Sequence, residues 1–79
     1  MSTFWWSRDN LWNRIRYEMC EEGKTEESTR RLVPEVREWD EEIGVRSPVG
    51  AALRQARVGD EVDVRVPGGV VVIKVLSVV

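Results

Sequence analysis

The last ten residues place the strongest constraint on the fold of this chain. Residues 70–79 read Val-Val-Val-Ile-Lys-Val-Leu-Ser-Val-Val and are apolar on both faces of an extended strand. Such a segment is typical of a central strand that is covered on both faces. Residues 61–66 alternate apolar and polar side chains, and the Pro-Gly-Gly turn at residues 67–69 joins them to this strand as a β-hairpin. A central strand needs a second neighbour as well.

Two sources of that second neighbour are open. Within the chain, the only other strand candidate is Thr-Phe-Trp-Trp at residues 3–6. Otherwise a second copy of the protein must supply it, because two isolated strands are not stable in water. We therefore expect either a homodimer that forms through its strands or pairing of residues 3–6 with the C-terminal hairpin.

A first helix is predicted for about residues 8–22. Apolar side chains recur there every fourth residue, at Leu11, Ile15 and Met19. Ser7 or Asp9 offers the N-cap, and the glycine at position 23 offers the stop.

A second helix is predicted for about residues 25–43, with Thr25 as its cap. Its apolar stripe follows helical spacing and consists of Leu32, Val36, Trp39 and Ile43. Pro34 lies inside the stripe, so the helix either kinks there or ends near Arg31 and begins again at the proline.

The predicted fold class is α+β, as one domain over residues 1–79 with a helical segment at 1–46. A short helix follows at about residues 48–56, with Ser47 as its cap and Pro48 at its first position, before the β-hairpin. Hydrophobic residues make up 42% of the chain and the net charge is −2, which excludes a disordered chain. The charge also lacks the basic footprint of a nucleic-acid-binding protein, so nucleic acid is not expected as a partner.

The residue types present exclude several classes of chemistry. There is no histidine and one cysteine, Cys20, so an internal disulfide, the common metal sites and Ser/His or Cys/His catalysis are not expected. We assign no catalytic, metal-binding or cofactor-binding residue, and no cofactor. The chain has no apolar run long enough to span a membrane and does not begin like a secretory signal, which predicts no membrane association and a cytoplasmic location.

Residues 47–79 resemble the C-terminal domain of the bacterial Gre transcript-cleavage factors, GreA and GreB. The resemblance is carried by four blocks in the same order, namely Ser-Pro-Val-Gly-Ala-Ala-Leu at 47–53, Val-Gly-Asp-Glu-Val at 58–62, Pro-Gly-Gly at 67–69 and Val-Leu-Ser-Val at 75–78. It implies an FKBP-like fold, in which a short helix packs over a twisted antiparallel sheet, without prolyl isomerase activity.

The same resemblance implies a partner. In the family, this domain docks on RNA polymerase near the secondary channel, and the loop with the Ser-Pro pair makes the contact. Carried over by position, the partner-binding residues are Arg46, Ser47, Pro48 and Val49. Relatives often have a polar or acidic residue where this chain has Arg46. On the residues alone, Ser47 and Pro48 also have a purely local role in starting the helix.

Cleavage activity is not expected, so the chain is predicted not to be an enzyme. Gre factors carry a long N-terminal helical hairpin whose acidic tip reaches the polymerase active site. The two helices predicted here would bring acidic residues to a turn, at Glu21, Glu22, Glu26 and Glu27. An arm of 15 residues spans only about 22 Å, however, and the tip motif of the family is absent.

Two alternatives to a polymerase-binding module remain. One is a structural, chimeric or synthetic fold without a selected function. The other is a DNA-binding dimer of the swapped-hairpin antitoxin type, whose members also show a proline-led short helix, a Gly-Asp turn and a valine-rich hairpin. That type carries a basic strand before the helix, whereas residues 35–43 here are acidic.

Overall fold

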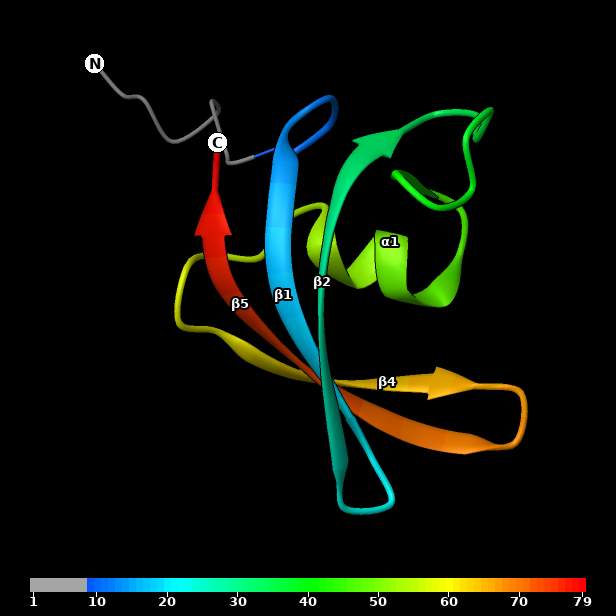
Figure 1. Cartoon of the computed structure of the whole chain (residues 1–79), viewed down its shortest axis with the longest axis vertical. Helices are drawn as coiled ribbons and strands as arrows, with labels where there is room; N and C mark the ends of the chain where they lie inside the picture. Colours follow the sequence, from blue (N-terminus) through cyan, green and yellow to red (C-terminus); the bar gives the residue numbers. More distant parts are fainter. Residues whose placement is uncertain (1–8) are drawn as a thin grey trace.

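The computed structural model describes residues 9–79, which form a five-stranded sheet and one short helix (Figure 1). The elements in chain order are β1 (Arg14–Glu21), β2 (Lys24–Val33), β3 (Glu42–Gly44), α1 (Pro48–Leu53), β4 (Glu61–Val66) and β5 (Gly69–Val78). The strand order across the sheet is β3-β2-β1-β5-β4. All neighbouring strands are antiparallel except β2 and β3, which are parallel. The sheet is strongly twisted, and α1 lies over one of its faces (Figure 1).

The predicted helix at residues 8–22 is wrong, because most of this segment is strand β1. Ile15 and Tyr17 lie two residues apart and are both fully buried, whereas the arginines at 14 and 16 are exposed. This is the alternation of a strand with one face toward a core. The glycine that was expected to end a helix instead forms a two-residue hairpin turn with Glu22, and both residues have positive φ, +51° for Glu22 and +81° for Gly23.

The predicted helix at residues 25–43 is also wrong. Its first part is β2, which pairs with β1 along the whole length of β1. Pro34 follows β2 directly, and because proline has no backbone N–H and disfavours helical conformation before it, the chain leaves the sheet in a loop. The expected apolar stripe is divided: Leu32 and Ile43 are partners in the parallel pairing of β2 and β3, whereas Val36 and Trp39 lie in the loop between the two strands.

The central position predicted for the last strand is confirmed, but the neighbour proposed for it is not. β5 lies between β4 and β1, so the second neighbour comes from a segment of the same chain that was expected to be helical. A second copy of the protein is therefore not needed to supply this neighbour, which was the reason for expecting a dimer. The other proposed neighbour, residues 3–6, lies outside the described residues.

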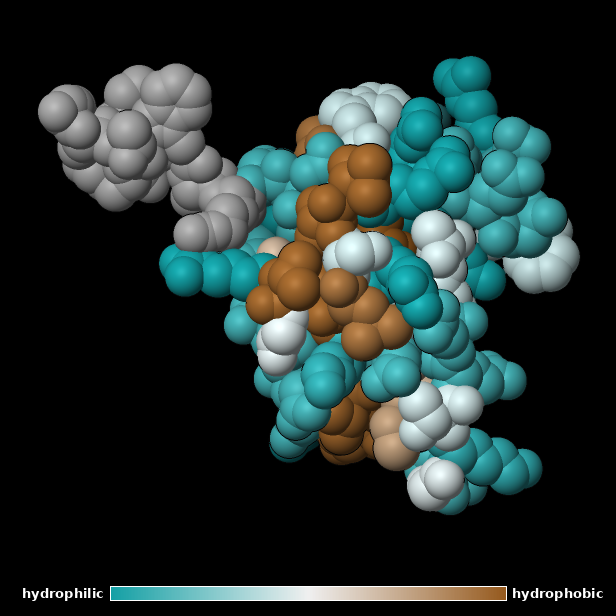
Figure 2. Space-filling view, turned by 60° about the vertical axis from the view of Figure 1, so that its left-hand side comes forward, coloured by the Kyte–Doolittle hydropathy of each residue, from teal (hydrophilic) through white to brown (hydrophobic). Residues whose placement is uncertain are grey.

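The two faces of β5 differ in burial. Val71, Ile73 and Val75 are buried against the helix side, whereas Val70 on the opposite face is 54% exposed and Val72 is half-buried. β5 was expected to be buried on both faces, and it is fully buried only on the face toward α1. Figure 2 shows apolar side chains in a band down the side of the molecule that carries β5.

A bulge in β5 keeps its C-terminal end in the core. Arg16 pairs with Ser77 and Tyr17 with Val75, which leaves Leu76 as an extra residue. The extra residue reverses the alternation, so Val75 and Val78 both pack toward the core. The helix side of the sheet is thereby closed by one cluster of buried side chains, which consists of Ile15, Tyr17, Leu32, Val49, Leu53, Ala56, Val64, Val71, Ile73 and Val75.

The short helix and the last turn agree with the sequence prediction. Helix α1 begins at Pro48 with Ser47 as N-cap, although it ends at Leu53 rather than at residue 56. The turn between β4 and β5 consists of Pro67 and Gly68, and Gly68 has a φ of +95° that suits glycine. Within residues 9–79, the structure has no helix long and apolar enough to cross a bilayer.

Candidate protein-docking groove

The four residues predicted to bind a partner lie together at the start of α1 but differ in accessibility. Arg46 and Pro48 are exposed, and Ser47 is half-buried. Val49 is only 8% exposed and belongs to the core cluster. Val49 therefore supports the surface from below and offers little of its own side chain to a partner.

Three of these residues line a shallow groove of about 400 Å³. The wall formed by the start of α1 consists of Ser47, Pro48 and Val49, and the remaining lining residues are Arg30, Val36, Trp39, Glu42, Ile43 and Gly44. The groove thus combines strand β2, strand β3, the loop between them and the helix N-terminus. Arg46 is not among its lining residues.

The most exposed apolar side chains of the groove come from the β2–β3 loop. Trp39 is 78% exposed and Val36 is 43% exposed. Sequence reasoning missed both as surface residues, because their spacing from Leu32 and Ile43 matched a helix stripe. Pro34 was the available signal, since it interrupts the segment on which the stripe depends.

The groove wall is held by a close contact between α1 and the end of β3. The Ser47 hydroxyl donates to the Gly44 carbonyl oxygen at 2.8 Å and accepts from the Gly50 backbone N–H at 3.0 Å. A Cβ placed on Gly50 would lie 1.8 Å from that same carbonyl oxygen. Glycine at position 50 is therefore required for the helix to approach β3 this closely.

Glu42 holds the loop that carries Trp39. Its Oε1 accepts the backbone N–H groups of Arg37 at 2.8 Å and of Glu38 at 3.0 Å. These two hydrogen bonds, with the Arg37 bond the larger cause, lower the pKa of the Glu42 carboxyl below its ordinary value. The loop is thereby fixed against β3 on the side opposite the helix.

Arg30 is the cationic residue that lines the groove. Its Nη1 donates to the Tyr17 hydroxyl at 3.3 Å. Its Nε is buried and has no hydrogen-bond acceptor. Because Arg30 pairs with the core-facing Ile15, its side chain lies on the same side of the sheet as α1.

The far end of α1 is fastened by residues that precede β1. The Asn10 amide nitrogen donates to the carbonyl oxygens of Leu53 at 2.7 Å and of Ala56 at 2.9 Å. Asn10 is 5% exposed, and the Asn10 backbone N–H also donates to the Arg54 carbonyl at 2.7 Å. These bonds bring donors to carbonyl groups at and just after the end of the helix, where the Leu53 oxygen also accepts the Ala56 backbone N–H at 3.3 Å.

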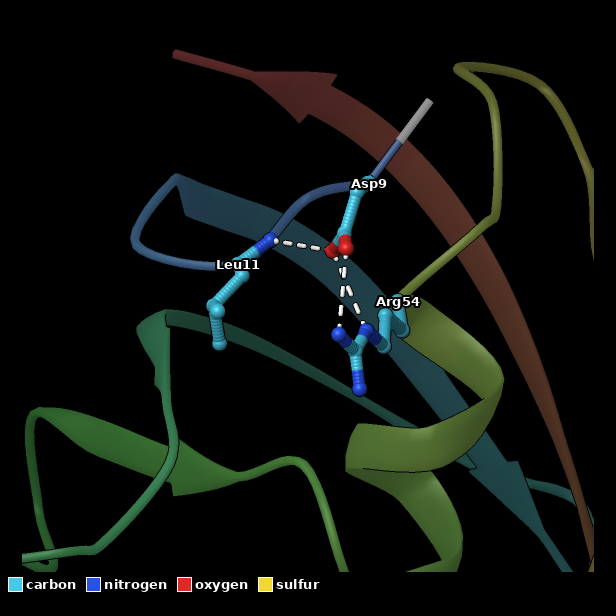
Figure 3. Close-up of polar contacts among 3 residues, drawn as sticks. All are labelled: Asp9, Leu11 and Arg54. Atoms are coloured by element: carbon cyan, nitrogen blue, oxygen red, sulfur yellow. Dashed lines mark hydrogen bonds and ion pairs between the residues drawn. The ribbon is translucent and has the colours of Figure 1, made fainter. Parts of the chain in front are cut away.

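Asp9 adds an ion pair at the same end (Figure 3). Its carboxylate accepts from Nε and Nη2 of Arg54, each at 3.1 Å, and from the Leu11 backbone N–H at 3.1 Å. The bond from Arg54 is the main reason that the pKa of Asp9 is lowered. Asp9 was predicted as a candidate N-cap of a helix, and here it instead joins the start of the described residues to the end of α1.

Known proteins show the same fold and pattern. A family model described as "Transcription elongation factor, GreA/GreB, C-term" matches residues 13–79, which include β1 and β2 as well as residues 47–79. The prokaryotic transcription elongation factor GreA/GreB from Nitrosomonas europaea shares 29% sequence identity at a TM-score of 0.62, over 91% of this chain and 61% of that chain.

A second solved structure agrees in fold alone. The GreA factor homolog 1 (Gfh1) of Thermus thermophilus has a TM-score of 0.62 at 24% identity, over 89% of this chain and 47% of that chain. This chain thus spans less than two thirds of either solved protein. No curated protein sequence matches it.

Proposed function

Because this chain belongs to the GreA/GreB family of transcription elongation factors, through the C-terminal domain of that family, we propose that it docks on bacterial RNA polymerase near the secondary channel and modulates transcription. The docking surface is the groove at the start of α1. One observation carries the proposal: the Ser47-Pro48 pair, to which the family resemblance points, lines the same apolar groove as the exposed Trp39.

The matched domain is a binding domain and not a catalytic one, which agrees with the expectation that the chain is not an enzyme. In the family that the chain resembles, transcript cleavage depends on a long helical hairpin. In this chain, the segments that were expected to be helical contain strands β1 and β2. The strands of the β4–β5 hairpin pair with one another, and β5 also pairs with β1 of the same chain. The swapped-hairpin DNA-binding alternative therefore has no support in residues 9–79.

The physical chemistry of the groove suits a protein partner. An exposed tryptophan offers a large apolar area at a low cost in conformational entropy, and tryptophan is enriched among residues that dominate binding energy. Trp39 stands on a loop that is fixed at its base by Glu42, and Pro48 stands on a rigid helix start. The backbone that carries both side chains is therefore held in place before binding, so less backbone freedom is lost when a partner docks.

The test is competition with a full-length Gre factor for bacterial core RNA polymerase. We expect the wild-type protein to compete and Trp39→Ala to weaken its binding by about tenfold or more, because a central aromatic anchor is typically worth over 1.4 kcal/mol. Pro48→Ala should weaken binding by a smaller factor, and Ser47→Ala is less informative because it also removes the helix cap.

Trp12→Ala is the matched control. Trp12 is another exposed tryptophan, at 59%, and it does not line the groove. Its removal should leave the competition within about twofold of the wild type. The absence of competition by the wild-type protein at tens of micromolar would overturn the proposal, as would equal losses in Trp12→Ala and Trp39→Ala.

A further inference from the structure

We propose that the docking groove selects a protein segment that presents a carboxylate beside an apolar side chain, and that Arg30 receives the carboxylate. The inference rests on the proposed function for its biological partner. It goes beyond the proposed function by stating which chemical groups the partner segment must carry.

The Arg30 guanidinium is incompletely hydrogen-bonded and lacks a counter-ion among the residues that the structure describes. Its Nη1 hydrogen bond to the Tyr17 hydroxyl involves a neutral group, and its buried Nε has no acceptor. A buried donor without an acceptor is unfavourable, and more so when the group is charged. The two ion pairs among residues 9–79 are Arg16–Glu27 and Arg54–Asp9, and neither includes Arg30. Arg30 is therefore a cation whose charge is not balanced by an ion pair in the described part of the chain.

Glu42, the acidic residue that lines the groove, is already engaged in hydrogen bonds. Glu42 lines the groove with Arg30, but its Oε1 accepts two backbone N–H groups of the β2–β3 loop. To move toward Arg30, this carboxylate would have to give up the bonds that fix the loop. Glu42 is therefore not available to Arg30, and no other carboxylate of residues 9–79 forms an ion pair with it, which leaves the partner as the source of an anion.

Within the described residues, Arg30 has a free edge that suits a carboxylate. A carboxylate binds a guanidinium best through two parallel hydrogen bonds, and one edge of the guanidinium offers Nε together with one terminal nitrogen. In Arg30, Nη1 is used by Tyr17 and Nε is unused. A small rotation of this long side chain toward the groove would meet an incoming carboxylate and also satisfy the unpaired Nε.

The surroundings of Arg30 indicate what else the partner segment must carry. Apolar surface beside Arg30 comes from Val36, Trp39 and Pro48, so the carboxylate must be accompanied by an apolar side chain. The β2–β3 loop is acidic and carries Glu35, Glu38, Asp40 and Glu41. The repeated phosphates of a nucleic acid would each be repelled by these like charges, whereas a protein segment would bring only one carboxylate, placed at Arg30, so the total repulsion would be smaller.

The experiment on the polymerase compares variants of Arg30 with a matched arginine on another surface. Arg30→Gln should weaken binding to bacterial core RNA polymerase by about tenfold or more, and Arg30→Lys, which keeps the charge but loses the two-bond geometry, by a smaller factor. Arg65→Gln, on an exposed position of β4, should stay within about twofold of the wild type. Thermal unfolding of each variant shows whether it is folded.

A second arm does not depend on the polymerase. The peptides acetyl-Leu-Glu-Leu-amide and acetyl-Leu-Gln-Leu-amide are titrated into the ¹⁵N-labelled full chain, and the Arg30 Nε–H signal is followed by NMR. The buried Nε–H should shift with the glutamate peptide at a dissociation constant at least about fivefold lower than with the glutamine peptide. An oligothymidylate of eight nucleotides serves as the nucleic-acid probe and should not shift it at the same concentration.

The outcomes separate this inference from the proposed function. If Trp39→Ala weakens polymerase binding but folded Arg30→Gln binds like the wild type, the docking proposal survives and the carboxylate inference is wrong. If the wild type does not bind polymerase at all, the peptide titrations still test the carboxylate inference. Equal affinities for the glutamate and the glutamine peptide would overturn it. A larger shift with the oligonucleotide than with the glutamate peptide also overturns it, because it assigns the groove to a different class of partner.

Discussion

At Gly50, one absent methyl group decides whether α1 can lie against the end of β3. A Cβ at this position would be placed 1.8 Å from the Gly44 carbonyl oxygen and 2.7 Å from the Gly44 carbonyl carbon, and these backbone atoms cannot move aside as the end of a side chain can. We expect Gly50→Ala to destabilise the fold by about 3 kcal/mol, measured by urea unfolding. Helix propensity alone predicts the opposite sign, since alanine is favoured over glycine by about 1 kcal/mol in a helix.

The neighbouring exposed position supplies the control for this prediction. Ala51→Gly makes the reverse exchange, alanine to glycine, at an exposed position of the same helix. It should lower the free energy of unfolding by only about 1 kcal/mol. If Gly50→Ala were stabilising, the close approach of α1 to β3 would be contradicted, and with it the shape of the groove wall.

The Asn10 side chain, which lies outside α1, donates hydrogen bonds to carbonyl oxygens at and just after the end of that helix. Asn10→Ala would leave the buried carbonyl oxygens of Leu53 and Ala56 without this donor, so we expect a loss of about 2–3 kcal/mol in the free energy of unfolding. Asn10→Asp should be at least as damaging, because a carboxylate donates no hydrogen bond. Asn13→Ala is the control, since the Asn13 amide makes only a long 3.5 Å contact to Asn10, and it should change stability much less.

The acid sensitivity of the protein is set by carboxylates whose pKa is lowered in the folded state, namely Asp9, Glu27 and Glu42. A lowered folded pKa means that the unfolded chain binds more protons in acid. The stabilisation is therefore complete above the unfolded pKa values of about 4 and is lost as the pH falls through the folded values. We expect Asp9→Asn to reduce the loss of stability between pH 6 and pH 3 in urea unfolding. Arg54→Gln should reduce it in the same way, because it removes the main cause of the shift, and an unchanged pH profile in both variants would contradict the ion pair.

At the scale of elements, the segments before and after residue 45 differed in how well the sequence predicted them. Residues 47–79 carry local signals that agree with each other, such as the Ser-Pro helix start and the Pro-Gly turn, and their elements were predicted in type and order. The position of Ser47 and Pro48 on a groove was consistent with the predicted partner surface, but Arg30, Val36 and Trp39 were missed. Those three come from segments that were assigned to a helix.

The error in the first segment has a specific physical origin. Leu11, Ile15 and Met19 are four residues apart, and because four is an even number, residues at this spacing also share one face of a strand. Tyr17 was the residue that distinguishes the two structures, since it joins that face in a strand and leaves it in a helix. It is fully buried, as the strand requires. The sequence of β2 shows no strand-like alternation, because its apolar residues occur only at its end, in Leu32 and Val33.

The hairpin between β1 and β2 offers a test of that element. Glu22 occupies a turn position with a φ of +51°, a region that asparagine tolerates much better than glutamate. We expect Glu22→Asn to raise the free energy of unfolding by about 0.5–1 kcal/mol. Glu21→Asn, at the last residue of β1, should give no gain. If Glu22→Asn destabilised the protein relative to Glu21→Asn, the two-residue turn would be contradicted.

At the scale of the whole molecule, the central strand β1 pairs with a strand that lies far from it in the sequence. β1 and β5 pair in the middle of the sheet, while β3 and β4 form its edges. Native-state hydrogen exchange should therefore find the slowest amides in β1 and β5, at Tyr17, Ile73 and Val75, which open only on global unfolding. The β3 amides should exchange through local opening, at rates that denaturant changes little. Faster exchange in β5 than in β3 would contradict the central position of β5.

The pairing of β1 with β5 also has a consequence for synthesis on the ribosome. Arg14 and Val79 exchange two backbone hydrogen bonds, each at 2.9 Å, so a residue near the start of the described chain is joined to its last residue. A nascent chain can form the β1–β2 hairpin early, but β1 keeps an open edge until the final strand has left the exit tunnel. During that interval the exposed edge of β1 is open to pairing with other extended chains. The acidic tip of the hairpin, with Glu21, Glu22 and Glu26, would repel similar nascent chains and so protect the domain before its sheet is complete.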